Sequence, residues 1–458
     1  MTLSSLVKQF TASAVLLTAL FTCLNTTAQN NSVEKRLDRA AALIRDNRMA
    51  EAEQELAYVL KVSPHKAAAL NLLGTIRAQQ GKLNEAEVVF LRAVRIDKGL
   101  VEAHMNLAYL YLLKGASAKS ITELQEVVRL DPKNTEATYK LARLLLSQSR
   151  IDECIGFIET VIQSQPRSAA LLVVLGDAYL GKGNADKAEE SYLLAFNEQS
   201  DNAEAILGLA RVTQGKGDKK TAALYLFRAR ELVADSPDLL YRFALVAVRL
   251  ELYEEAKSAL EQAVKLKPNE PAYLLALGAT WIKRPDLFAA EQAFRSALQL
   301  QPDSAQAQMY LGYVLFKQKK YPEARIYLER TIKTDASTPE PSYYLGLIAQ
   351  EQGEDERALE IFERLVKRFP EFNNAHIALG STYLKLKNYP RAQRELELAA
   401  RLNPDEPTAH YQLAMLYARL KDPQRAQEEM RIVEQLKNTG KAIEKENDVL
   451  PPAKPSPR

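Results

Sequence analysis

Apolar and polar positions along the chain repeat with a period of 34 residues, twelve times, from Val33 to Gly440 without an insertion. Column eight of every repeat is Ala or Gly, and column twenty is Ala except for Ser120 and Cys154. A fixed period of this size indicates stacked supersecondary units in place of one globular core.

Each repeat predicts two amphipathic helices, the first over columns 1–14 and the second from about column eighteen. Glycine in column fifteen follows the first helix in five repeats, where a left-handed residue costs it nothing. Proline in column thirty-two ends the second helix in seven repeats. Residues 147–150 lack this glycine and Pro285 replaces it, so we expect these two turns to be reshaped.

Large side chains recur in column twenty-four and complement the small residues of column eight. They are Leu56, Phe90, Leu124, Ile158, Tyr192, Leu226, Leu260, Phe294, Leu328, Phe362, Leu396 and Met430. Small residues allow two helix axes to approach, and large neighbours fill the remaining space. The pattern predicts closely packed helix pairs.

These columns resemble the tetratricopeptide repeat, with a small residue at eight, alanine at twenty, a bulky residue at twenty-four and proline at thirty-two. The resemblance covers 408 of the 458 residues. It implies an all-α fold, a right-handed α-solenoid (superhelix) of twelve 34-residue helix-turn-helix repeats whose first helices line a concave groove. It also implies binding of a protein or peptide, without catalysis and without a cofactor.

Composition adds few functional signals. The net charge is only +3, from 61 basic and 58 acidic residues, which gives no indication of a nucleic-acid partner. The four histidines, His65, His104, His376 and His410, have none of the close spacings typical of metal ligands. We expect no metal and no enzymatic activity, and we expect Cys154 to be a buried small side chain.

Residues 1–28 resemble a secretory signal peptide. Lys8 is their only charged residue, an apolar stretch follows, and Thr26-Thr27-Ala28 offers a small-x-small cleavage site. A retained membrane anchor and lipidation at Cys23 are the alternatives. We expect residues 29–32 to be a short linker, 33–440 the twelve repeats, and 441–458 a partly helical and then disordered proline-rich tail.

In the family, columns two, five, nine, twelve and thirteen of the first helices face the groove. Tyrosines there offer large area at low entropy cost, so they are candidate anchors for a ligand, although they are alternatively padding of the inner wall. The strongest candidates lie between Met309 and Tyr343. The candidate groove residues are Tyr109, Tyr139, Arg143, Arg211, Tyr241, Met309, Tyr313, Phe316, Lys317, Tyr343 and Tyr411.

Acidic residues in column two and basic residues in column thirteen complement the helix dipole, although they also suit an acidic ligand. Together these features predict a non-catalytic protein-protein interaction scaffold of the bacterial cell envelope, periplasmic or secreted. The alternative is a dedicated accessory subunit of an envelope machine for polysaccharide export, pilus assembly or outer-membrane assembly. Membrane association is expected only through an uncleaved or lipidated leader.

Overall fold

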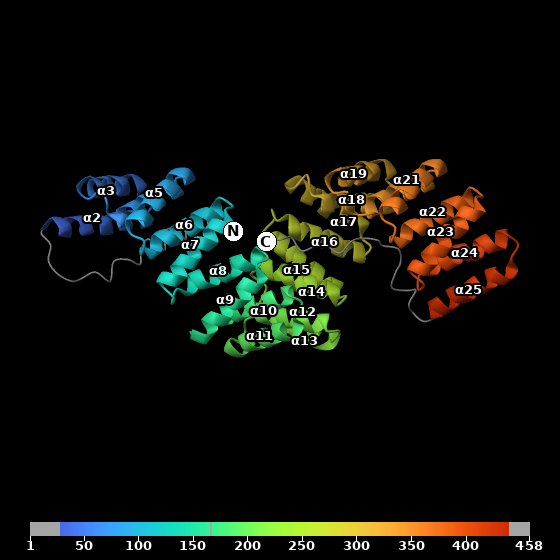
Figure 1. Cartoon of the computed structure of the whole chain (residues 1–458), viewed down its shortest axis with the longest axis horizontal. Coiled ribbons are helices and arrows are strands. Elements are labelled where there is room, and N and C mark those ends of the chain that lie inside the picture. The colour runs from blue at the N-terminus through green and yellow to red at the C-terminus, as the bar shows by residue number, and fades with distance from the viewer. Residues whose placement is uncertain (1–27, 165–166, 439–458) are drawn as a thin grey trace. The chain divides into compact units, whose positions relative to one another are not determined.

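The computed structural model describes residues 28–164 and 167–438, which form helices and turns without a strand (Figure 1). The predicted all-α class is therefore confirmed for the described chain. The predicted signal peptide, apart from Ala28, and the whole of the predicted tail, 441–458, lie outside the described residues.

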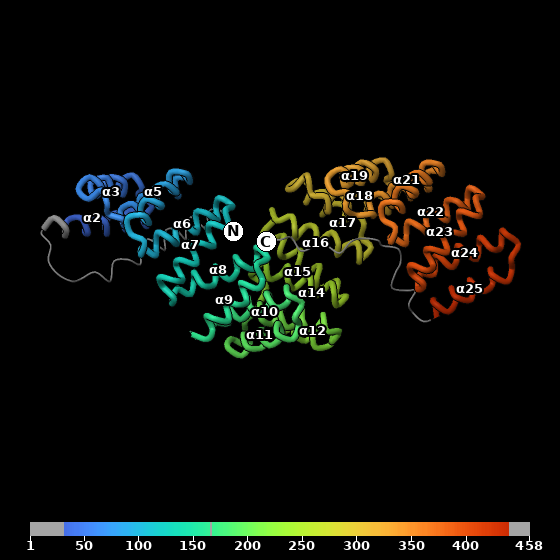
Figure 2. Tube along the Cα trace, in the orientation of Figure 1, coloured from blue at the N-terminus to red at the C-terminus, as the bar shows by residue number. Residues whose placement is uncertain are grey.

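The described chain divides into two compact units after Asp218, and each unit is a stack of helix pairs. The trace in Figure 2 follows the pairs from one repeat to the next within each unit. The helices of unit 1 are α2 (Ala28–Arg45), α3 (Met49–Val62), α4 (Ala67–Gln79), α5 (Leu83–Ile96), α6 (Val101–Leu113), α7 (Ser117–Leu130), α8 (Thr135–Ser147), α9 (Ile151–Ser164), α10 (Ala169–Gly181), α11 (Ala185–Glu198) and α12 (Ala203–Gly215).

Unit 2 continues the same alternation of first and second helices. Its helices are α13 (Lys219–Ala229), α14 (Pro237–Arg249), α15 (Tyr253–Leu266), α16 (Pro271–Lys283), α17 (Leu287–Leu300), α18 (Ala305–Lys317), α19 (Tyr321–Thr334), α20 (Glu340–Glu351), α21 (Asp355–Arg368), α22 (Asn373–Lys385), α23 (Tyr389–Leu402), α24 (Pro407–Arg419) and α25 (Pro423–Asn438). In both units each second helix also packs against the first helix of the next repeat.

The two helices of a repeat meet where column eight faces column twenty-four. At Gly74, an added Cβ would lie 2.6 Å from the ring carbon Cε1 of Phe90, so nothing larger than glycine fits opposite this ring. Gly176, Gly278 and Gly346 face Tyr192, Phe294 and Phe362 in the same way. Every aromatic side chain in column twenty-four is therefore matched by glycine, whereas alanine in column eight is matched by an aliphatic residue.

The turn inside the repeat is a Schellman motif in eleven of the twelve repeats. The N–H of column sixteen donates to the carbonyl of column eleven in all twelve repeats, and the N–H of column fifteen donates to column twelve in eleven of them. Column fifteen is left-handed in these eleven turns, and six of them use a residue other than glycine: Asn47, Ser149, Glu251, Lys319, Lys387 and Lys421.

Of the two turns expected to differ, only one does. Ser149 has φ 58° and makes the usual bonds, so the expectation of a reshaped turn at residues 147–150 was wrong. Pro285 has no N–H and a fixed negative φ, so its turn keeps only the bond from Asp286 N to Trp281 O, 3.1 Å long.

Two further details were not expected. Residues 29–32 are not a linker but the first turn of α2, since this segment contains neither proline nor glycine to prevent helix formation. The second helix of repeat six, α13, has only 11 residues where most second helices have 14, and turns occupy residues 230–235.

Column twenty tolerates a polar atom because a carbonyl of column eight faces it. The Cys154 Sγ lies 3.3 Å from Ala142 O and the Ser120 Oγ lies 2.9 Å from Ala108 O. Cys154 is fully buried, as expected, and burial raises the pKa of its thiol to about 11. The side chain is a packing residue.

We expect Gly74→Ala to destabilise repeat two, because the new Cβ overlaps the Phe90 ring and overpacking costs about 1–3 kcal/mol. Phe90→Leu in the same chain should recover most of this loss, since alanine opposite leucine is a pair that other repeats use. Chemical denaturation of the single and double variants gives the coupling energy. Additive losses would contradict the proposed contact.

Cys154 should resist a thiol reagent at pH 8 in the folded chain and react at once in denaturant, because the thiolate form is suppressed and the sulfur is covered. A chain with Cys23→Ser isolates this thiol. Labelling of the folded chain at the rate of a small free thiol would show that repeat four is open.

Candidate functional site

Four of the predicted groove residues are buried. The exposed fractions of Tyr109, Tyr313, Met309 and Tyr343 are 0, 1, 3 and 9%. The prediction that the stretch from Met309 to Tyr343 forms an accessible wall for a ligand is thus wrong for these side chains. Adjacent first helices pack against each other, and large side chains in columns five and nine fill the space between them.

Tyr109 shows what such a residue does in unit 1. Its hydroxyl donates to Glu136 Oε1 of the next repeat at 2.5 Å, and the Lys140 Nζ lies 5.0 Å from its ring centroid. Burial and the Glu136 carboxylate raise the pKa of the Tyr109 hydroxyl. Tyr109 therefore joins repeats three and four.

The predicted aromatic stretch in unit 2 does come together, but as an internal cluster. Its centre is Tyr344, whose ring centroid lies 5.3 Å from those of Tyr313 and Phe316 and 5.4 Å from that of Tyr343. Tyr343 also meets Phe372 edge to face at 5.6 Å, and burial raises its pKa to about 12. Tyr344 was not among the predicted residues, because column six is not a groove column of the family.

A second set of tyrosines, in column eleven, joins repeats at the opposite end of the first helix. The hydroxyls of Tyr179, Tyr383 and Tyr417 each donate to a glutamate in column twenty-five of the preceding repeat. A cation in column nineteen lies over each ring, as Arg425 does over Tyr417 at 4.4 Å. The regular spacing of Tyr, Arg or Lys, and Glu was a signal that the sequence contained.

The predicted groove residues of unit 1 that remain accessible are either arginines or lie close to an arginine in the sequence. Arg143 lies 3.6 Å from Asp177, which also accepts a 2.6 Å hydrogen bond from the Tyr192 hydroxyl. Arg211 is exposed, and Tyr139 is half-buried. Columns five and nine of unit 1 thus mix charges with apolar residues.

In unit 2 the same two columns carry no charge from repeat seven to repeat twelve. We call their large accessible members the apolar strip: Tyr241, Leu245, Leu275, Leu347, Ile377 and Met415 are half-buried and Tyr411 is 46% exposed. They lie on α14, α16, α20, α22 and α24, and successive first helices from α14 to α24 pack side by side (Figure 1). Phe316, in column twelve, is half-buried beside the internal cluster.

Exposed basic residues lie at the C-terminal ends of the same helices. We call this set the basic rim: Arg249, Lys283, Lys317, Lys385 and Arg419. Lys317 Nζ lies 5.8 Å from the Tyr313 ring centroid, and Lys385 pairs with Asp355 at 2.7 Å. Glu351 interrupts the rim in repeat ten. The arrangement suits an apolar segment with acidic flanks.

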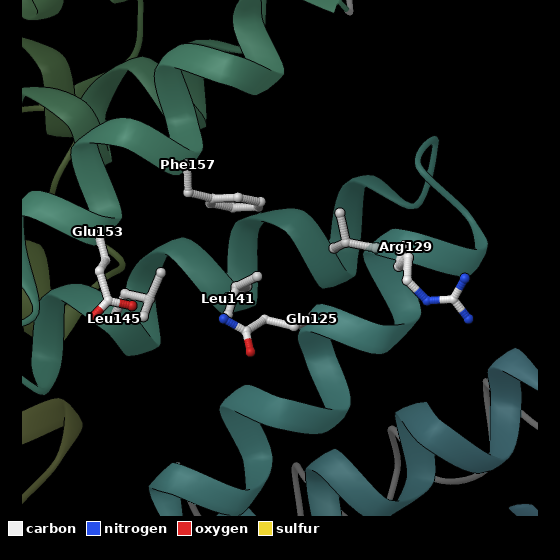
Figure 3. Close-up of a pocket in the computed structure, with 7 residues that line it drawn as sticks. Gln125, Arg129, Leu141, Leu145, Glu153 and Phe157 are labelled. Carbon is white, nitrogen blue, oxygen red and sulfur yellow. The ribbon is translucent and has the colours of Figure 1, made fainter.

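A separate cavity of about 290 Å³ lies among α7, α8 and α9 in unit 1 (Figure 3). Leu141, Leu145 and Phe157 give it an apolar lining. The Arg129 guanidinium is held by Glu126 at 2.5 Å, and Glu153 is held by Arg150 at the same distance. The charged groups at this cavity are therefore engaged within their own helices or turns.

Among residues 28–164 and 167–438, no cluster of His, Cys, Asp and Glu is arranged to hold a metal ion. Within the same part of the chain, no helix has the length and apolar character needed to cross a membrane.

Family models of the tetratricopeptide repeat match three segments of the chain, residues 37–100, 101–134 and 349–407. The model described as the cilia and flagella-associated protein 70 C-terminal domain matches residues 158–342. No curated protein matches the chain. Among solved structures, that of Naa15/Naa10 bound to HypK-THB is 16% identical, with a TM-score of 0.37, and the match covers 87% of this chain and 68% of that one.

Proposed function

The chain belongs to the tetratricopeptide repeat family, and on this premise we propose that it is a scaffold whose apolar strip in unit 2 binds an extended or helical protein segment. The observation that carries the proposal is the exposure of Tyr411. Met309, Tyr313 and Tyr343 in the same two columns of unit 2 are buried, and the other large apolar side chains there are half-buried, whereas Tyr411 is 46% exposed. A tyrosine on a rigid helix is a typical binding anchor.

Charge defines the expected ligand further. The strip offers apolar contacts without a competing carboxylate, and the basic rim beside it favours acidic residues at the flanks of the bound segment. Since the rim is exposed, its contribution should fall as salt rises. A segment with two or three apolar residues and flanking Asp or Glu fits this surface.

The binding test uses the chain without its leader to select ligands from a random peptide library, followed by calorimetry with an enriched peptide. Tyr411→Ala should weaken binding about thirtyfold, since a central aromatic anchor contributes about 2 kcal/mol. Tyr58→Ala is the matched control, because Tyr58 is 43% exposed but lies on the second helix α3.

Equal losses for Tyr411→Ala and Tyr58→Ala, or no enrichment of apolar and acidic peptides, would contradict the proposed strip. Variants at Tyr313 or Tyr343 are unsuitable for this purpose. Both side chains are buried, and removing a large buried aromatic group destabilises the fold by about 3–5 kcal/mol.

We further propose that the scaffold works in the bacterial cell envelope, as a periplasmic or secreted protein. The support is the sequence of residues 1–28, with one charge, an apolar stretch and a small-x-small site. A dedicated accessory subunit of one envelope machine is the alternative, and it would bind a single partner in place of many segments of similar chemistry.

Export should remove residues 1–28, because Thr26 and Ala28 are small enough for the pocket of the signal peptidase. Intact-mass measurement on protein recovered from the envelope fraction should give a chain that begins at Gln29. A chain beginning at Cys23 with added lipid mass would indicate a membrane-anchored protein, and a full-length chain would contradict cleavage.

A further inference from the structure

Three histidines occupy the same position in the repeat and make the same two contacts. Each lies in column four of a first helix: His104 on α6, His376 on α22 and His410 on α24. Each Nδ1 faces a glutamate in column twenty-three of its own repeat, and each Nε2 faces the column thirty-two carbonyl of the preceding repeat. His104 lies 2.7 Å from Glu123 and 3.2 Å from Lys98 O. His376 lies 2.7 Å from Glu395 and 3.0 Å from Pro370 O. His410 lies 2.6 Å from Glu429 and 3.2 Å from Pro404 O.

Both partners of each ring are acceptors. A carbonyl oxygen cannot donate, a carboxylate cannot donate, and a neutral imidazole has one N–H only. Two hydrogen bonds therefore require one proton more than a neutral imidazole and a carboxylate contain together. When this proton leaves, one of the two bonds must be lost.

The two bonds have different structural roles. The bond to glutamate joins the two helices of one repeat, as between His376 on α22 and Glu395 on α23. The bond to the carbonyl joins that repeat to the preceding one, as between His376 and Pro370 after α21. Because the ring is nearly covered, at 4% exposure for His376 and 6% for His104, water cannot readily replace a lost partner.

In one repeat a glutamine takes the place of the histidine and bonds the same carbonyl without a titrating group. Gln308 occupies column four of repeat nine, and its Nε2 donates to Pro302 O at 2.8 Å. An amide donates at every pH, so this junction has no titrating member.

We propose that His104, His376 and His410 form protonation-dependent hydrogen bonds that stabilise the junctions between successive repeats. Each junction is stabilised while the imidazole and its glutamate share the extra proton, and it is weakened when that proton is lost. The three histidines act at the junctions of repeats two and three, ten and eleven, and eleven and twelve. Two of the three are consecutive, so a rise in pH loosens α22–α25 together, which carry Ile377, Tyr411 and Met415.

The carboxylates around the rings favour the protonated form of the imidazole. Glu123 and Glu126 of α7 act on His104, and Glu395 of α23 acts on His376. Glu429 of α25 faces His410. The turn before α24 also holds Asp405 and Glu406, and Glu406 caps the helix through Thr408 N at 3.1 Å.

The direction of the pH effect follows from the pKa of the rings. Burial lowers the pKa of His376, but its hydrogen bonds with Glu395 and the Pro370 carbonyl outweigh burial, so the pKa is raised. Burial also lowers the pKa of His104, but the hydrogen bonds of the ring with Glu123 and the Lys98 carbonyl outweigh burial, so this pKa is raised as well. The stabilisation is therefore complete below the unfolded value of about 6.5 and is lost as pH rises through the higher folded pKa.

Nuclear magnetic resonance of ring ¹⁵N-labelled histidine in the chain without its leader tests the protonation directly. His65, exposed in the turn between α3 and α4, is the reference ring in the same spectrum. The signals of His104 and His376 should show both nitrogens protonated at pH 6.5 and should titrate above the value of about 6.5 of a free imidazole. Neutral rings at pH 6.5 would overturn the proposal.

Amide hydrogen exchange of α22–α25 tests the mechanical consequence, with α18 and its Gln308 junction as the internal standard for intrinsic rates. Between pH 6.5 and 9, protection of α22–α25 should fall relative to α18. The double variant His376→Gln and His410→Gln copies Gln308, and it should abolish this relative change while the helices remain folded.

Glu395→Gln supplies an independent variant. A neutral His376 can then accept from the amide at Nδ1 and donate to Pro370 O at Nε2, so both bonds persist without the extra proton. The His376 titration should move down, and protection of α22 should become less dependent on pH. An unchanged pH dependence in both variants would show that the imidazoles do not control the junctions.

Discussion

The contact between column eight and column twenty-four sets the distance between the two helices of each repeat, and the rest of each unit depends on that distance. A glycine opposite Phe90, Tyr192, Phe294 or Phe362 leaves no room for a Cβ, so the ring is in van der Waals contact with the facing helix. Where column eight is alanine, a thinner aliphatic side chain takes the place of the ring. In repeats nine and eleven glycine faces leucine, Gly312 with Leu328 and Gly380 with Leu396. Each of these combinations keeps the helix pair closely packed, which allows unlike sequences to form the same unit.

The two helices of a repeat are held together by this packing, whereas polar side chains at a few columns form hydrogen bonds between successive repeats. Tyr109 with Glu136, Tyr417 with Glu397, and His376 with the Pro370 carbonyl each connect one repeat to the next. These bonds are buried or half-buried, where an unmade bond is costly, so they select one register between neighbouring repeats. Tyr109, Tyr179, Tyr383 and Tyr417 serve this role, and Tyr313, Tyr343 and Tyr344 pack in the internal cluster. The accessible surface of the first helices is therefore smaller than the number of tyrosines indicates.

What remains accessible differs between the units. Columns five and nine carry Arg143, Asp177 and Arg211 in unit 1, whereas they carry no charge from α14 to α24 in unit 2. A ligand with apolar residues would lose fewer hydrogen bonds to water on the second surface than on the first, because fewer polar groups there must be desolvated. The proposal for the strip around Tyr411 rests on this difference and on exposure.

The sequence by itself determined the all-α class, the period, most helix bounds to within a residue or two, and the burial of Cys154, because these depend on local propensity and on columns that every repeat shares. The start of α2 and the end of α13 are the exceptions. It also placed Met309, Tyr313, Phe316 and Tyr343 close together. Only the tertiary structure decided that Tyr313 and Tyr343 are buried while Tyr411 is exposed, since all three occupy groove columns and differ only in what the next helix covers. The division after Asp218 and the paired contacts of the histidines likewise arise between segments that only folding brings together, so the pattern within one repeat cannot show them.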